Sequence, residues 1–131
     1  MINTYQQSFS DHNKKKEINM WEEWIGREVT VVMDRPLGTR HPVHGFMYPL
    51  NYGYIPNTVS DDNEELDAYV LGVDYSLETF TGKVIAIIHR LNDQDDKLIV
   101  VAANEVCLYS DEKIRELTKF QEQFFDSIII R

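Results

Sequence analysis

The chain has 131 residues, of which 43% are hydrophobic, and this is enough for one domain with a buried core. Its 22 acidic and 13 basic side chains give a formal net charge of -9, which argues against binding nucleic acid or an anionic membrane surface. Cys107 is the one cysteine, which excludes an intrachain disulfide. The sequence has neither an apolar run of the ~18 residues that span a bilayer nor a secretory signal, so we expect a soluble cytoplasmic protein.

The first 18 residues are polar and have no hydrophobic period, which indicates a flexible extension in front of a single domain over residues 19–131. Asn19 is a suitable N-cap and Gly26 a suitable end, so the segment between them predicts a short helix. Its two tryptophans, Trp21 and Trp24, lie three positions apart and are expected to pack on one face.

The next segments favour extended structure. Residues 28–34 and 67–73 are β-prone runs, each bounded by polar or turn-forming residues. Between them, the aromatic stretch 45–56 is broken by Pro49 and Gly53 into short pieces that suit sheet edges or bends.

Residues 83–91 form the longest apolar strand candidate, and a short polar loop joins them to residues 97–103, which predicts a β-hairpin. From Ser110, a suitable N-cap, the pattern becomes helical. Apolar residues then recur at three- and four-residue steps: Ile114, Leu117, Phe120, Phe124 and Ile128. We therefore expect an α+β fold: a small closed or curved antiparallel β-barrel, OB-like, with a short N-terminal helix and a C-terminal helix.

Five carboxylates occupy the seven positions from Asp61 to Asp67, directly before the β-prone run "AYVLGV". Asp62, Glu64 and Asp67 lie where this loop enters a strand, and they could supply part of the oxygen shell that Mg²⁺ prefers. An acidic, solvated surface loop is the alternative. The spacing is not that of an EF-hand loop, because the turn glycine and the closing glutamate are missing.

A second acidic group, Asp93, Asp95 and Asp96, lies in the predicted hairpin turn. Because both groups lie at the ends of strands expected in one sheet, they can converge on one mouth. Carboxylates gathered there would repel one another and raise one another's pKa values, and a bound divalent cation would relieve this. The two groups together predict a Mg²⁺ site and leave open whether Asp95 or Asp96 is the ligand.

Residues that suit a phosphate ligand lie nearby. Arg40 offers a planar fork of donors and Lys97 a compact charge. Hydroxyl donors are available from three tyrosines, Tyr48, Tyr52 and Tyr54. The tyrosines suit core packing equally well, and Lys97 suits a surface ion pair with the carboxylates beside it.

Three stretches together resemble a known family. "YPLNYGYIPNT", "DNEELDAYVLG" and "NDQDDKLIVV" are similar to segments of the soluble, Mg²⁺-dependent inorganic pyrophosphatases, which have a small β-barrel core. The resemblance covers about residues 28–103, with a weaker similarity in "FQEQFFDS".

The resemblance implies a set of site residues. The three signature acids of the family fall on Asp62, Glu64 and Asp67, and its second acidic pair falls on Asp93 and Asp95. The phosphate-binding residues of the family fall on four further positions: Arg40, Tyr48, Tyr52 and Lys97.

The implied activity is hydrolysis of inorganic pyrophosphate to phosphate by a metal-activated water. Asp67 would help to hold the Mg²⁺ ions, and Glu64 would hold or deprotonate the attacking water. Arg40 and Lys97 would offset charge on the leaving phosphate. Family members commonly assemble as homo-oligomers, and we expect the same here.

Three departures keep other readings open. The middle acid of the family is Asp, where this chain has Glu64; residues 28–34 lack a Lys and a Glu of the family; and Ile128 and Ile129 stand at about the positions of its phosphate-binding Tyr–Lys pair. The alternatives are a metal- and phosphate-binding protein with little or no turnover, a hydrolase of a different phosphoanhydride, and a structural barrel with acidic loops. Three arginines are candidates to replace the lost contacts: Arg35, Arg90 and Arg131.

Overall fold

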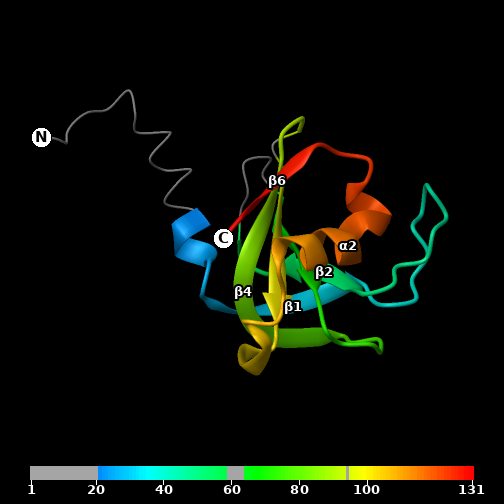
Figure 1. Cartoon of the computed structure of the whole chain (residues 1–131). Coiled ribbons are helices and arrows are strands. Elements are labelled where there is room, and N and C mark those ends of the chain that lie inside the picture. Colours follow the sequence, from blue (N-terminus) through cyan, green and yellow to red (C-terminus); the bar gives the residue numbers. More distant parts are fainter. Residues whose placement is uncertain (1–20, 59–63, 94) are drawn as a thin grey trace, which may run out of the picture.

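The computed structural model describes residues 21–58, 64–93 and 95–131. Within these ranges the chain forms a barrel of short strands and one long helix that packs on its outside (Figure 1). The elements are β1 (Glu28–Arg35), β2 (Asn51–Ile55), β3 (Leu66–Val70), β4 (Thr79–Arg90), β5 (Asp96–Val101), the 3-10 turn η1 (Ala103–Glu105), α2 (Asp111–Glu122) and β6 (Ser127–Ile130). No helix in the described ranges is long and apolar enough to cross a membrane.

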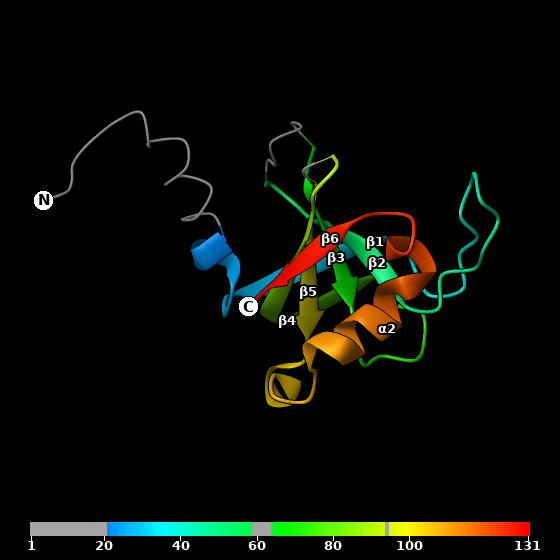
Figure 2. The ribbon, with the colours of Figure 1, turned by 45° about the horizontal axis from the view of Figure 1, so that its top comes forward.

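The strands follow the order β1-β2-β3-β5-β4-β6, and an additional pairing of β1 with β4 closes the first five into a barrel (Figures 1 and 2). This confirms the small barrel that the sequence predicts. The prediction that it is antiparallel is wrong for one pair, because β3 and β5 run parallel. β5 is antiparallel to β4, and β4 is antiparallel to β1, so β5 runs in the direction of β1. β3 runs in that direction too, because β2 is antiparallel to both β1 and β3.

The predicted hairpin is confirmed by the antiparallel register of β4 and β5. Its first strand starts at Thr79, earlier than the predicted 83, because Thr79–Lys83 pairs with β1 to close the barrel. Residues 21–24 are helical, as predicted. The cap at Asn19 and the extension over residues 1–18 lie outside the described residues.

The C-terminal helix is shorter than predicted. Its N-cap at Ser110 is confirmed, since the Ser110 hydroxyl accepts a hydrogen bond from the Lys113 amide at 3.1 Å. The helix ends at Glu122, and the last apolar residues form β6, which pairs antiparallel with the outer edge of β4. Three consecutive isoleucines suit a strand because β-branched side chains lose conformational freedom in a helix. The helical pattern through Phe124 and Ile128 is therefore wrong.

Alternation along the strands divides the buried side chains into two clusters. One cluster takes residues from all five barrel strands and fills the barrel, for example Val31, Leu66 and Leu98. The other covers the outside of the sheet and packs against α2, for example Tyr69 and Ile99. Polar side chains at every second position along β3 from Tyr69 therefore lie on the outside of the sheet, the face that packs against α2.

The aromatic stretch serves packing, which was one of its two predicted roles. Tyr48 is fully buried and Tyr52 is 7% exposed. Asn51, also buried, accepts hydrogen bonds from the amides of Leu37 and Leu77 and donates to the carbonyl of Tyr75, so it ties the β1–β2 loop to the β3–β4 loop. Gly53 is required because a Cβ there would lie 2.0 Å from the Val32 carbonyl oxygen on β1.

Candidate functional site

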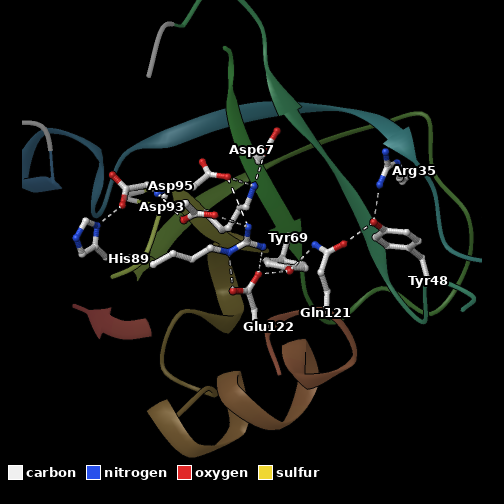
Figure 3. Close-up of polar contacts among 12 residues, drawn as sticks. Arg35, Tyr48, Asp67, Tyr69, His89, Asp93, Asp95, Gln121 and Glu122 are labelled. Carbon is white, nitrogen blue, oxygen red and sulfur yellow. Dashed lines mark hydrogen bonds and ion pairs between the residues drawn. The ribbon is translucent and has the colours of Figure 1, made fainter. Parts of the chain in front are cut away.

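The two acidic segments meet because β3 and β5 run parallel and begin at the same edge. Asp67 is in register with Lys97. The Lys97 Nζ atom lies 2.5 Å from Asp67 Oδ2 and 2.8 Å from Asp95 Oδ2, so one ammonium group joins both segments. Figure 3 shows the carboxylates of Asp67 and Asp95 directed toward this shared point. Lys97 itself is 4% exposed, and it is therefore no ordinary surface lysine.

Alternation along β5 separates Asp95 from Asp96. Asp95 and Lys97 lie on the outside of the sheet, whereas Asp96 lies on the opposite face. There Asp96 bonds to His89 Nδ1 at 2.6 Å and accepts a hydrogen bond from the Trp21 indole at 3.3 Å. Burial raises the pKa of Asp96. Of the two candidates, Asp95 is thus the one that faces Asp67.

A cavity of about 290 Å³ opens beside this pair. Its lining is mostly acidic: Asp34, Tyr54, Glu64, Glu65, Asp67 and Asp95. Asp34, at the end of β1, is an addition that the sequence patterns did not suggest. Burial raises the pKa of Asp34, and the nearby charge of Asp67 acts in the same direction. The lining thus collects carboxylates from the ends of several elements around one space.

The other predicted carboxylates lie at different distances from this cavity. Glu64 lines it, together with Asp67. Asp93 is in the β4–β5 turn, where its Oδ1 atom accepts a hydrogen bond from the Asp95 amide at 3.1 Å, and its side chain is 45% exposed. Asp62 lies outside the described residues.

Arg40 is not brought to the carboxylates. It lies on the loop between β1 and β2, which projects from the barrel in Figure 1, and it donates to the Gly45 carbonyl at 2.8 Å. It is absent from the described lining of the acidic cavity. Arg35, at the end of β1, is directed inward and donates to the Tyr48 hydroxyl at 2.8 Å.

Tyr52 lies between the packing cluster and the polar group. The Lys97 ammonium is 5.7 Å from the centroid of its ring. Burial raises the pKa of Tyr52 well above its usual range, and the Asp67 carboxylate adds to this shift. Tyr52 is therefore a neutral hydroxyl next to Asp67 at any ordinary pH.

A chain of buried polar side chains that the sequence patterns missed extends from this group beneath α2 (Figure 3). Glu122 accepts a hydrogen bond from the Tyr69 hydroxyl at 2.6 Å, and Gln121 links the hydroxyls of Tyr69 and Tyr48 at 2.7 and 2.5 Å. Glu122 also accepts two hydrogen bonds from the Arg90 guanidinium. In sequence, Gln121 and Glu122 lie in "FQEQFFDS", whose weak similarity to the family assigns neither of them a role.

A second cavity, of about 190 Å³, lies on the other side of Lys97. Its walls come from the β1–β2 loop, from the strands and from the end of α2. Its lining residues include two cations, Arg90 and Lys97, and the rings of His41, His44, Phe46 and Phe124. The ring centroids of His44 and Phe124 are 5.4 Å apart in a stacked arrangement, which connects the loop to the end of the helix.

Residues 7–129 match the family model described as inorganic pyrophosphatase. The chain belongs to the inorganic pyrophosphatase family. It is 35% identical over 92 residues to the inorganic pyrophosphatase of Saccharolobus solfataricus, which covers 66% of this chain and 50% of that protein. It is also 35% identical over 109 residues to that of Halobacterium salinarum, which covers 72% and 57%. The chain thus spans about half the length of these curated pyrophosphatases.

Solved pyrophosphatases share the fold. The inorganic pyrophosphatase of Ehrlichia chaffeensis superposes with a TM-score of 0.62 at 15% identity, covering 79% of this chain and 84% of that one. That of Thermus thermophilus gives 0.55 at 20% identity, covering 79% and 80%. The closed barrel with its outer helix is thus the fold of pyrophosphatases.

Pyrophosphatases of this family depend on metal ions, and the donor chemistry of the acidic cavity fits such an ion. Carboxylate oxygens are the ligands of hard divalent cations, and Glu64, Asp67 and Asp95 line one space with two further acids. Within the described ranges, no three His, Cys, Asp or Glu residues are drawn together at ligand spacing. Asp67 and Asp95 instead share the Lys97 ammonium, which occupies the position between the two carboxylates.

Proposed function

We propose that this pyrophosphatase family member hydrolyses inorganic pyrophosphate to phosphate with Mg²⁺ as its metal ion. The observation that supports this most directly is that Glu64, Asp67 and Asp95 line one acidic cavity, two of them bonded to the buried cation Lys97. An anionic substrate is otherwise unfavourable for a protein with a net charge of -9. Such a substrate requires local positive charge, from a bound metal ion or from cationic side chains.

Asp67, Asp93 and Asp95 are the proposed metal ligands among the described residues, and Asp62, which lies outside them, is a further member from the first acidic segment. A divalent cation held there would lower the pKa of a bound water toward neutrality. Glu64, in the same cavity, would accept the proton of the attacking water through its carboxylate. Glu64 stands in the position of the middle acid of the family.

Lys97 would serve the substrate as well as the carboxylates. Its ammonium group already lies between Asp67 and Asp95, so a phosphate bound at the cavity would find a positive charge beside the metal ligands. Preorganised charge of this kind stabilises the developing charge of a leaving phosphate. Tyr52, held neutral next to Asp67, would be a hydroxyl donor at the same place. We further propose a homo-oligomer, as the family resemblance implies, with a cytoplasmic location as the sequence analysis expects.

The experiment is phosphate release from pyrophosphate in the presence of Mg²⁺, comparing wild type with Asp67→Asn. Asparagine keeps the shape of the side chain and removes its charge. We expect the rate to fall about a hundred-fold or more, because the variant loses a metal ligand and the partner of Lys97.

Asp74→Asn is the matched control, because Asp74 is exposed and lies outside the described lining of the acidic cavity. It should retain the wild-type rate. Circular dichroism establishes that Asp67→Asn is folded, and Asp95→Asn provides the second test of the same site. Equal rates for wild type and both site variants would refute the assignment. Binding of pyrophosphate without release of phosphate would identify the protein as a non-catalytic member.

A further inference from the structure

Arg90 is a buried arginine in the wall of the cavity that Lys97 also lines. We propose that Arg90 binds a phosphate group of the substrate and that Glu122 of α2 is its positioning residue. This inference rests on the proposed function above and deepens it, since it assigns to one cavity the phosphate that does not face the metal ligands.

The Arg90 guanidinium is fixed from two sides. Its Nε atom donates to Glu122 Oε1 at 3.0 Å and its NH2 atom to Glu122 Oε2 at 2.7 Å. The guanidinium carbon lies 3.6 Å from the centroid of the Phe125 ring. Burial alone would lower the pKa of Arg90, but the hydrogen bonds and charge of Glu122 raise it, so the group stays cationic. It is held in one orientation before any ligand arrives.

The two bonds to Glu122 leave the NH1 end of the guanidinium for other partners. NH1 makes two longer ion pairs, to Asp93 and Asp95 at 3.7 Å, and among the described residues no hydrogen bond to it is found. Arginine has five N–H donors in a fixed fork, so donors remain that can contact a phosphate oxygen without displacing Glu122.

Two cations line the cavity, Arg90 and Lys97. Each is paired with carboxylates, Arg90 with Glu122 and Lys97 with Asp67 and Asp95, but none of these carboxylates is in the described lining. Its volume of about 190 Å³ is below the ~300 Å³ of pockets for drug-sized ligands, which suits a phosphate group better than a large organic molecule. Charge and size together point to a phosphate.

The position of the cavity suits a phosphoanhydride. Lys97 lines this cavity while its ammonium bonds Asp67 and Asp95 of the acidic cavity. The two spaces therefore meet at Lys97. A pyrophosphate with one phosphate at the metal ligands would have its other phosphate beside Lys97 and Arg90.

The other two arginines that the sequence offered are engaged elsewhere. Arg35 donates to the Tyr48 hydroxyl, and Arg131 pairs with Asp111 on the surface at 2.7 Å. Neither is in the described lining of this cavity. Arg90 is therefore the arginine that the fold places beside Lys97.

A purely structural role is the competing explanation, because the pair of Arg90 and Glu122 also ties β4 to α2. The two explanations differ in what Arg90→Met should change. A structural role predicts a lower melting temperature and unchanged ligand affinity of the folded protein. Phosphate binding predicts weaker binding as well.

The experiment measures affinity for imidodiphosphate, a non-hydrolysable analogue of pyrophosphate, by calorimetry with Mg²⁺ present and well below each melting temperature. Arg90→Met should weaken binding by about ten- to a hundred-fold, the value of a charged hydrogen bond. It should raise KM for pyrophosphate by a similar factor. Arg90→Lys, which keeps the charge and loses the fork, should lose roughly ten-fold or less and covers the case in which Arg90→Met does not fold.

Arg131→Met is the matched control, because it breaks another ion pair of α2 outside the cavity, and it should bind as wild type does. Wild-type affinity in both Arg90 variants, with activity intact in wild type, would overturn the role of Arg90 and leave the proposed function standing. If wild type itself neither binds imidodiphosphate nor hydrolyses pyrophosphate, the proposed function fails, and this inference fails with it.

Discussion

At the scale of single residues, Tyr52 and Tyr69 show how the fold keeps hydroxyl groups neutral beside carboxylates. Burial raises the pKa of both well above the usual range, with Asp67 adding to the shift of Tyr52 and Glu122 to that of Tyr69. Their folded-state pKa values are raised above the unfolded value of about 10. The stability they contribute is thus present below that pH and is lost as the pH rises through the folded-state values.

An alkaline titration followed by the absorbance of tyrosinate tests this. A delayed fraction of the tyrosines should ionise together with unfolding. Tyr52→Phe should make this delayed fraction smaller by one tyrosine. An unchanged delayed fraction in Tyr52→Phe would contradict the buried, neutral state of this hydroxyl.

The sequence indicates some of the residues that the structure brings together and not others, and their separation along the chain explains the difference. Asp67, Asp95 and Lys97 belong to short acidic motifs, so their types and spacing suggest a site before any fold is known. The pairing of Arg90 with Glu122 joins residues 32 positions apart, so the sequence offers Arg90 as a candidate without indicating its partner. Arg40 illustrates the reverse case: its type fits phosphate, but the loop turns its guanidinium to Gly45.

At the scale of elements, β6 is the largest difference from the sequence patterns. A helical period continues through Ile128, yet residues Ser127–Ile130 pair with the free edge of β4. Period alone cannot separate a short apolar run in a helix from one in a strand. Pairing with the free edge of β4, which the local sequence pattern does not reveal, decides that these residues form a strand.

The strand assignment predicts different costs for two neighbouring isoleucines. Ile130 packs against the cluster that fills the barrel, whereas Ile128 is 44% exposed. Ile130→Ala should lower the free energy of unfolding by about 1–2 kcal/mol, less than a fully buried isoleucine would lose. Ile128→Ala should change it by no more than about 0.5 kcal/mol.

Urea unfolding of the two variants provides the comparison. Each substitution removes the same atoms, so Ile128→Ala is the matched control for Ile130→Ala. A continued helix would bury Ile128 with the apolar face of α2, and a larger loss in Ile128→Ala than in Ile130→Ala would contradict β6.

At the scale of the whole molecule, closure of the barrel decides where the site lies. The parallel pairing of β3 with β5 follows from the order of all five strands, and it brings both acidic segments to one edge. The sequence patterns predicted that the two acidic segments converge, but that prediction assumed antiparallel strands and did not include the register between β3 and β5. That register sets Asp67 beside Lys97 and separates Asp95 from Asp96.

The same arrangement gives the molecule two adjoining spaces, one lined mostly by carboxylates and one whose lining includes two cations. The acidic cavity beside Asp67 suits a divalent cation, and the cavity lined by Arg90 and Lys97 suits a phosphate. With a net charge of -9, the protein as a whole repels a pyrophosphate anion. Binding should therefore depend on the metal ion that neutralises the acidic cavity.

The most direct test is the rate of phosphate release from pyrophosphate by the wild-type protein as Mg²⁺ is raised from zero. We predict no release in the presence of a chelator, and a rate that rises with Mg²⁺ and reaches a plateau as the carboxylate site fills. A rate that does not exceed that of protein-free buffer at any Mg²⁺ concentration would contradict the account.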